Sequence, residues 1–255
     1  FIQILNMLSI NSLKKIKSLK TKKGRNAEKL FLIEGKRSVE EYILKSDLVN
    51  EVIISELKLK NYKSVLDLCD KRKIKISVVT DSISKELSDT KTPSGLLATC
   101  KINLLIQKKY NSSRWLFLYK IKDPGNLGTI LRSAAWFNIK NIALSKDCAD
   151  PYNNKVVRSA MGAHIYINIH QEVNINEFIK NNFFIIGADQ NGDNSVEQKD
   201  LSRKIVLCLG GESRGFDDQI IKKLDKLVSI KKIGHGESLN VAIAGSIFMN
   251  YLSQK

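Results

Sequence analysis

Short apolar runs alternate with helix-length amphipathic stretches along most of this chain, and this alternation constrains the fold more than any other feature. Strands that alternate with helices predict a parallel sheet covered by helices on both faces. The alternation restarts at Arg114 after a polar stretch. We therefore predict an α/β protein with one domain over residues 1–105, a linker over 106–113 and a second domain over 114–255.

The spacing of apolar residues also predicts the individual elements. In the first domain we expect strands at 31–33, 51–54, 74–79 and within 91–99, and helices at 12–25, 35–44, 57–69 and 83–87. In the second domain we expect strands at 114–119, 141–144, 165–169, 183–188, 205–209 and 226–230, and helices at 127–137, 152–161 and 238–252. Ser238 is the expected N-cap of the last helix, and residues 189–200 predict a polar surface loop.

Three polar blocks in the second domain follow apolar runs and lead into helical patterns. They are Asp123-Pro-Gly-Asn-Leu-Gly-Thr-Ile-Leu-Arg132, Leu209-Gly-Gly-Glu-Ser-Arg-Gly215 and Glu237-Ser-Leu-Asn-Val-Ala242. Ligands of α/β sheets bind at the ends of strands, in loops of this kind. Three such loops in one domain predict one composite site.

Most residues of these blocks also have a plain structural explanation. Gly210 and Gly211 allow a backbone to approach a ligand, or they simply form a turn. Glu212 could accept hydrogen bonds from a hydroxyl or hold an arginine, or it is a solvated loop carboxylate. Ser238 and Asn240, taken singly, suit helix caps.

Two arginines carry the same ambiguity. Arg132 lies six residues after Asn126 and offers a planar donor fork for a phosphate or an oxyanion, or it is a helix-surface arginine. Arg158 follows Asp150-Pro-Tyr-Asn-Asn154 and is a phosphate contact or a surface charge.

The net charge of +16 is uneven along the chain. Residues 1–110 hold 23 Lys+Arg against 12 Asp+Glu, and residues 12–25 hold seven basic residues and no acidic one. A cationic amphipathic helix suits RNA, DNA or an acidic membrane surface; the alternative is a lysine-rich composition inherited from an AT-biased genome. The candidate phosphate contacts with a nucleic acid are Lys14, Lys15, Lys17, Lys20, Lys22, Lys23, Arg25, Arg37 and Arg158.

The sequence lacks the patterns that are typical of several other kinds of protein and site. The four cysteines are widely spaced and only three histidines occur, so we expect free thiols, a reducing cytoplasmic location and no metal. No apolar run approaches the length of a membrane span, and the first ten residues lack the features of a signal peptide. GxSxG, HExxH, Walker and GxGxxG motifs are absent.

Together the three blocks resemble the SpoU (TrmH-type) RNA ribose 2′-O-methyltransferases of the SPOUT class. Asn126-Leu-Gly-Thr-Ile-Leu-Arg132 resembles the family's N-x-G-x-x-x-R block, Gly210-Gly-Glu-Ser-Arg-Gly215 its G-x-E-x-x-G block, and Ser238-Leu-Asn-Val-Ala-Ile-Ala244 its S-L-N-V-[AS]-x-A block. The N-terminal half resembles the L30e-like substrate-binding domain of many members, through Phe31-Leu-Ile-Glu-Gly-Lys-Arg37 and Thr92-Pro-Ser-Gly-Leu-Leu-Ala98.

The resemblance implies a C-terminal parallel-sheet domain with a trefoil knot, S-adenosylmethionine (SAM) held in the knot, and a homodimer formed through that domain. Carried over position by position, it implies cofactor contacts at Gly210, Gly211, Ile230 and Leu239 and catalytic positions at Asn126, Arg132, Glu212, Ser238 and Asn240. The stretch Lys231-Lys-Ile-Gly-His-Gly236 departs from the family's commoner Pro-Met-x-Gly pattern, and His235 receives no role.

The implied reaction moves a methyl group from a sulfonium to a ribose hydroxyl, which is a poor nucleophile unless its proton is removed. Arginine keeps its proton far above neutral pH, so Arg132 either acts as the family's proposed base, stabilises the developing alkoxide, or orients a phosphate that takes the proton. Large-subunit ribosomal RNA is the expected substrate. The alternatives are transfer RNA and a non-catalytic RNA-binding or ribosome-assembly role.

Overall fold

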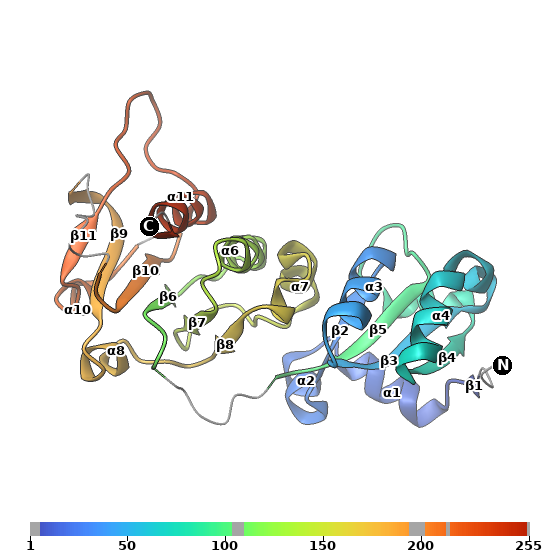
Figure 1. The fold of residues 1–255 in the computed structure, drawn as a ribbon. Helices are drawn as coiled ribbons and strands as arrows, with labels where there is room; N and C mark the ends of the chain where they lie inside the picture. Colours follow the sequence, from blue (N-terminus) through green and yellow to red (C-terminus); the bar gives the residue numbers. More distant parts are fainter. Residues whose placement is uncertain (1–5, 104–109, 194–201, 213–214, 254–255) are drawn as a thin grey trace. The chain divides into compact units, whose positions relative to one another are not determined.

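The structure is a computed structural model that describes residues 6–103, 110–193, 202–212 and 215–253. The chain divides into two compact units (Figure 1). Unit 1 comprises residues 1–104 and 152–165, and unit 2 comprises residues 105–151 and 166–255. Both have the predicted α/β character. Within the described residues, none of the helices has the length and apolar character that crossing a membrane requires.

The sheet of unit 1 is mixed rather than purely parallel. Its strand order is β1-β4-β3-β5-β2. β1 (Asn6–Met7), β4 (Lys75–Val79) and β3 (Val49–Ser55) are parallel, whereas β5 (Leu96–Lys101) is antiparallel to β3 and to β2 (Leu30–Glu34). Periodicity alone could not give these directions, because it specifies which residues are buried but not which strand lies beside which.

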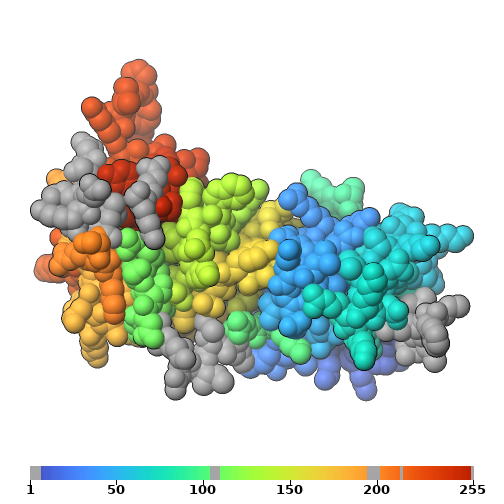
Figure 2. Space-filling view, viewed as in Figure 1, coloured from blue at the N-terminus to red at the C-terminus, as the bar shows by residue number. Residues whose placement is uncertain are grey.

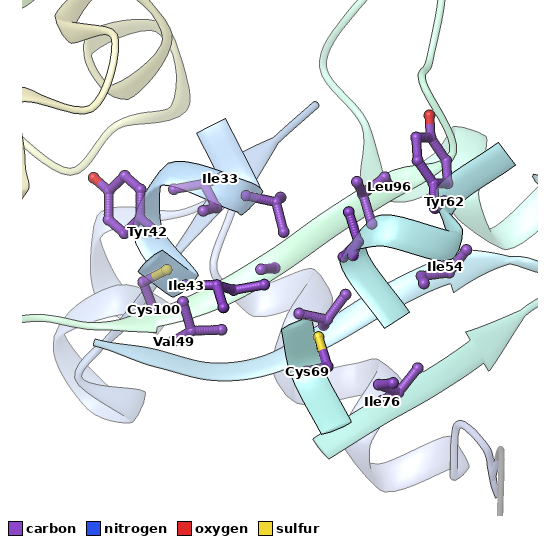
Figure 3. Close-up of a cluster of buried hydrophobic side chains, with 14 of the residues drawn as sticks. Ile33, Tyr42, Ile43, Val49, Ile54, Tyr62, Cys69, Ile76, Leu96 and Cys100 are labelled. Carbon is purple, nitrogen blue, oxygen red and sulfur yellow. The ribbon is translucent and has the colours of Figure 1, made fainter. Parts of the chain in front are cut away.

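Helices cover both faces of this sheet. They are α1 (Ile10–Ser18), α2 (Lys22–Glu28), α3 (Lys36–Lys45), the 3-10 helix η1 (Glu56–Tyr62), α4 (Lys63–Arg72) and α5 (Asp81–Leu87). Alternate strand residues enter opposite cores, because successive side chains of a strand point to opposite faces. Ile33 joins the core that also holds Tyr42 of α3 and Cys69 of α4 (Figure 3). Phe31 belongs to the same core, while Leu32 packs with Ile16 of α1.

The basic N-terminal segment forms two helices, not the single helix predicted. The chain turns after Ser18, and Thr21 caps α2 by accepting a hydrogen bond from the Gly24 amide at 3.0 Å. A Cβ atom at Gly24 would lie 2.0 Å from the Ser18 carbonyl oxygen, so this tight turn depends on glycine.

A segment between β7 and β8 packs into unit 1, although the sequence pattern placed it in the second domain. It contains α7 (Asn154–Ala160) and the 3-10 helix η2 (Ala163–Ile165). The ring of Tyr152 lies 5.1 Å from that of Phe31, and Val157 is buried in the same core. The Asn154 side chain donates a hydrogen bond to Asp89. The chain therefore leaves unit 2, completes the core of unit 1, and returns.

Unit 2 contains a six-stranded parallel sheet, as predicted, with strand order β11-β9-β10-β6-β7-β8. The strands are β6 (Arg114–Tyr119), β7 (Asn141–Leu144), β8 (Asn168–His170), β9 (Phe184–Asp193), β10 (Ile205–Gly210) and β11 (Lys226–Val228). Residues 189–193, predicted as loop, extend β9 beside β11; residues 194–200 of that predicted loop lie outside the described ones. After β6 the chain adds β7 and β8 on one side of it, and β10 lies beside β6 on the other side, so the strand order reverses at β6. Such a switch point is where open α/β sheets bind ligands.

Among the described residues, helices cover the two faces of this sheet. α8 (Asn176–Lys180) and α10 (Asp218–Ile221) contribute Phe178 and Ile220 to a core with Trp115 and Phe117 of β6. α6 (Pro124–Trp136) packs against α11 (Val241–Ser253), where the Ser133 and Ser246 hydroxyls are 2.7 Å apart (Figure 1).

Candidate active site

The three polar blocks converge at the carboxyl ends of β6 and β10. The two strands are neighbours in parallel register, so Gly210 at the end of β10 pairs with Tyr119 at the end of β6. The first block begins four residues after Tyr119, and the second includes Gly210. The third block enters α11, which packs on α6. The sheet register thus brings together the first two blocks, whose residues Asn126 and Glu212 lie 86 positions apart in the chain.

The first block forms the start of a helix rather than a loop. The Asp123 carboxylate accepts a hydrogen bond from the Asn126 amide at 2.8 Å, and Pro124 occupies the first helical turn. Proline is favoured at this place because its missing N–H would have no helical partner there. α6 therefore starts three residues earlier than the predicted Leu127, and Asn126 is held rigidly in its first turn.

A chain of side-chain hydrogen bonds links one residue from each block. The Asn126 amide nitrogen donates to the Glu212 carboxylate at 3.0 Å, and the Asn240 amide nitrogen donates to the Asn126 carbonyl oxygen at 2.9 Å. The Asn240 oxygen in turn accepts from the backbone amides of Ala242 and Ile243 at 2.9 and 3.3 Å. Asn240, not the predicted Ser238, therefore caps α11, and its cap also orients Asn126.

The turn after β10 has room only for glycine. A Cβ atom at Gly210 would lie 2.7 Å from the carbonyl carbon of Gly215, and one at Gly211 would lie 2.6 Å from the carbonyl oxygen of Lys120. Both contacts are with backbone, which cannot move aside easily. The Gly215 amide closes the turn by donating to the Gly211 carbonyl at 2.9 Å. Glu212, which follows these two glycines, is exposed.

A second cluster, which the sequence did not reveal, fixes the far end of this turn. Both the Tyr119 hydroxyl and the Lys120 ammonium group donate to Asp217, the latter at 3.1 Å, and Phe216 packs beside the Tyr119 ring. Burial raises the pKa of Tyr119, and its hydrogen bond to Asp217 raises it further. Hydrogen bonds from Tyr119 and Lys120 lower the pKa of Asp217. Asp217 also caps α10, because its carboxylate accepts a hydrogen bond from the Ile220 amide at 3.1 Å. Its position before a short helix is the only sequence signal for this role.

The other predicted site residues are not part of this hydrogen-bonded chain. Arg132 is exposed on α6, and Ser238 and Leu239 are exposed before α11. Ile230 is half-buried after β11. Within the described part of the chain, no hydrogen bond joins any of these four side chains to the Glu212–Asn126–Asn240 chain.

The predicted RNA contacts fall into three groups. Lys14, Lys22, Lys23, Arg37 and Arg158 are exposed. Lys15, Lys17 and Lys20 form ion pairs with Glu28, Glu86 and Asp89 at 3.7, 2.7 and 3.0 Å. Arg25 is only 2% exposed, and its guanidinium donates to the Leu19 carbonyl at 2.7 Å. The prediction for Arg25 is therefore wrong, because the turn between α1 and α2 buries this side chain.

Comparison with known proteins identifies both units. The model of the SpoU rRNA Methylase family matches residues 113–250, and that of the MRM3-like substrate binding domain matches residues 11–98. The chain is 28% identical to the 23S rRNA (guanosine(2553)-2′-O)-methyltransferase RlmP of Bacillus subtilis, over 92% of this chain and 93% of that protein.

Solved structures agree with this over nearly the whole length. An RNA methyltransferase assigned to the TrmH family from Porphyromonas gingivalis is 27% identical and superposes with a TM-score of 0.81, covering 96% of this chain and 98% of that one. An AdoMet-bound rRNA methyltransferase from Sinorhizobium meliloti, 23% identical, superposes with a TM-score of 0.79, covering 98% and 96%.

Fold and site together define an RNA methyltransferase with a separate substrate-binding unit. More particularly, the chain belongs to the SpoU rRNA methylase family. The family assignment confirms the predicted class of enzyme, a SAM-dependent RNA methyltransferase, and the predicted substrate-binding character of the N-terminal half.

Proposed function

We propose that this enzyme methylates a ribose 2′-hydroxyl of large-subunit ribosomal RNA. The observation that carries the proposal is the hydrogen-bonded chain Glu212–Asn126–Asn240, which joins all three blocks at the switch point of the sheet. The relative from Bacillus subtilis, which matches over nearly its full length, is a 2′-O-methyltransferase of 23S rRNA. That relative favours ribosomal RNA over transfer RNA.

We assign SAM to the turn at Gly210 and Gly211, because its main chain lies at the carboxyl end of β10, beside the Glu212–Asn126–Asn240 chain, where open α/β sheets bind ligands. We assign Ile230 and Leu239 to the same cofactor contact. SAM supplies a methyl group on a sulfonium, which departs as a neutral thioether. Glu212 and Asn240 hold the amide of Asn126 in one orientation, so that the site is preorganised before substrate arrives.

Arg132 is the residue we assign to the reacting hydroxyl. A guanidinium that stays protonated can stabilise the oxygen as its negative charge develops, or it can orient a phosphate that accepts the proton. Its exposed position on α6 leaves it accessible to RNA. Ser238, also exposed, is assigned to orient Arg132 and the cofactor.

The proposed activity is tested by methyl transfer. Purified enzyme with radiolabelled SAM should label large-subunit RNA taken from cells that lack the gene, and mapping of 2′-O-methyl groups should find one site missing in those cells. Labelling of transfer RNA instead would support the alternative substrate. SAM binding without labelling of either RNA would support the non-catalytic role.

We further propose that unit 2 contains the trefoil knot and that two copies associate through it. α11 carries three exposed apolar residues at four-residue spacing, Ile243, Ile247 and Tyr251, and this spacing places them on one helix face. An exposed apolar stripe of this kind is typical of a protein–protein interface. An experimental structure with an unthreaded chain path would contradict the knot.

The RNA substrate and the free thiols favour a cytoplasmic location.

Ile247→Glu should convert the dimer to a monomer, because it would bury a carboxylate in each half of a symmetric apolar contact. Sedimentation velocity measures the change. Ile179→Glu is the matched control, since Ile179 is similarly exposed, at 47% against 43%, but lies on α8. A dimer that survives Ile247→Glu would show that the contact lies elsewhere.

Among the N-terminal lysines, Lys14, Lys22 and Lys23 should supply the RNA affinity, because they are exposed and, among the described residues, have no acidic partner. Replacing all three by Gln should flatten the log–log salt dependence of RNA binding by about 2.1–2.7, by analogy with counterion release from nucleic acids. The same change at Lys15, Lys17 and Lys20 should have a smaller effect, since their charges are partly neutralised. Equal slopes for wild type and both variants would favour a solvated lysine-rich surface without a role in binding.

A further inference from the structure

The turn that follows β10 is held at both of its ends by the last residue of β6. We call its described residues, 210–212 and 215–217, the β10 turn. At one end, Gly210 pairs with Tyr119 in the register of the two neighbouring strands (Figure 1). At the other end, Asp217 accepts a hydrogen bond from the Tyr119 hydroxyl. One tyrosine at the end of β6 therefore closes the β10 turn onto the sheet.

The next residue, Lys120, fixes the same turn from a strained position. Its backbone lies in the left-handed region, at φ 55°, which is unfavourable for a residue with a Cβ atom. Its amide donates to the Ser145 hydroxyl at 2.9 Å, and its ammonium group donates to Asp217 at 3.1 Å. Its carbonyl oxygen faces Gly211, where a Cβ atom would lie only 2.6 Å away. Strained residues that several contacts hold in place are common where a site must keep one geometry.

The carboxylate of Asp217 is fully engaged by its neighbours. One oxygen accepts from Tyr119 and Lys120, and the other accepts from the Ile220 amide at 3.1 Å. The hydrogen bonds from Tyr119 and Lys120 lower the pKa of Asp217, so this carboxylate is a poor general base. An exposed lysine–aspartate pair also adds little to stability by itself. What the three residues together determine is the geometry of the β10 turn.

The β10 turn is also the part of the proposed cofactor site that is tied to the sheet. The other assigned contacts, Ile230 and Leu239, border or belong to residues 231–240, all of which are exposed. This segment projects from the rest of unit 2 (Figures 1 and 2). Ordering a loose segment opposes binding, whereas a turn that already has its bound shape adds no such cost. Fixing the β10 turn in advance therefore favours tight binding of the cofactor.

We propose that Tyr119, Lys120 and Asp217 are positioning residues for SAM, which hold the β10 turn in the shape that the cofactor binds and so set its affinity. The inference rests on the proposed function, which assigns SAM to this turn. None of the three residues acts on the reacting ribose. Asn126 and Arg132 belong to α6, which has its own N-terminal cap. The rate of methyl transfer at saturating SAM is therefore independent of the cluster.

The test is Tyr119→Phe, which removes only the hydroxyl that binds Asp217 and keeps the ring beside Phe216. Calorimetry should find SAM binding weakened by about tenfold, the order of one hydrogen bond to a charged group. Single-turnover kinetics at saturating SAM should change little. Asp217→Asn keeps an acceptor oxygen, so it should retain more SAM affinity than Asp217→Ala.

Tyr110→Phe is the matched control. The Tyr110 hydroxyl also donates to a carboxylate of unit 2, that of Glu177 on α8, but Tyr110 precedes β6 and Tyr119 ends it. Loss of the Tyr110 hydroxyl should lower the melting temperature about as much as loss of the Tyr119 hydroxyl, because each removes one hydrogen bond of the same kind. It should leave the affinity for SAM unchanged.

Unchanged SAM affinity in both Tyr119→Phe and Asp217→Ala would overturn the inference, as would an equal weakening by Tyr110→Phe. A lower rate at saturating SAM with unchanged affinity would overturn it too, and would assign the cluster to the chemical step. The calorimetry needs neither RNA nor turnover. A wild-type protein that binds no SAM would contradict the proposed function itself, whereas equal SAM binding by wild type and Tyr119→Phe would contradict only the positioning role.

Discussion

Arg132→Ala should lower the rate of methyl transfer by about 100- to 1,000-fold, the effect seen when one donor to a developing oxyanion is removed. SAM affinity should change little, since the assigned cofactor contacts lie in the turn at Gly210 and in the residues around Ile230 and Leu239. Single-turnover kinetics and calorimetry separate the two quantities. Arg132→Lys should restore little activity, because lysine lacks the planar donor fork.

Lys122→Gln is a suitable control for this experiment. Lys122 is another exposed cation beside the first block, and only its backbone amide touches Glu212. If Arg132→Ala and Lys122→Gln lower the rate equally, Arg132 contributes only general charge. Near-normal turnover in Arg132→Ala would remove it from the catalytic residues.

Gly210→Val should abolish measurable SAM binding while the protein remains folded. The new Cβ would lie 2.7 Å from the Gly215 carbonyl carbon, so the turn that we assign to SAM must open. Calorimetry measures the affinity, and circular dichroism with sedimentation checks fold and assembly. Gly234→Val is the control for folding, because nothing lies within 4 Å of that position. Unchanged SAM affinity in Gly210→Val would contradict the cofactor assignment.

Periodicity predicted the sheet of unit 2 well, because its strands are buried on both faces. Strands β6 and β10 match their apolar runs within one residue. Helix starts were predicted less well. The Asp123-Pro124 pair sets the start of α6 through a cap and a first-turn proline, and Asn240 displaces Ser238 as the cap of α11 because its side chain also meets Asn126. Which residue caps α11 therefore depends on a contact with a residue distant in sequence, and a local sequence pattern does not contain that contact.

The candidate site could likewise be predicted from the sequence only in part. The three blocks could be recognised from their composition and order, and their meeting follows from parallel strands that end at one edge. The cluster of Tyr119, Lys120 and Asp217 could not be found this way, since a tyrosine and a lysine at a strand end and an aspartate some hundred residues later have no shared spacing. Burial of Arg25 was equally invisible, because it depends on the turn between α1 and α2.

Residues 152–165 pack in unit 1, so the methyltransferase half of the sequence does not form a complete structural unit by itself. Tyr152 and Val157 lie in a core built from β2, α3 and α4, so a protein cut before residue 106 would carry an orphaned apolar helix in the middle of its methyltransferase sequence. Fusion of this catalytic half to a different RNA-binding module would leave the same helix uncovered. A substitution in this core of unit 1 therefore also acts on residues that belong to the methyltransferase half of the sequence.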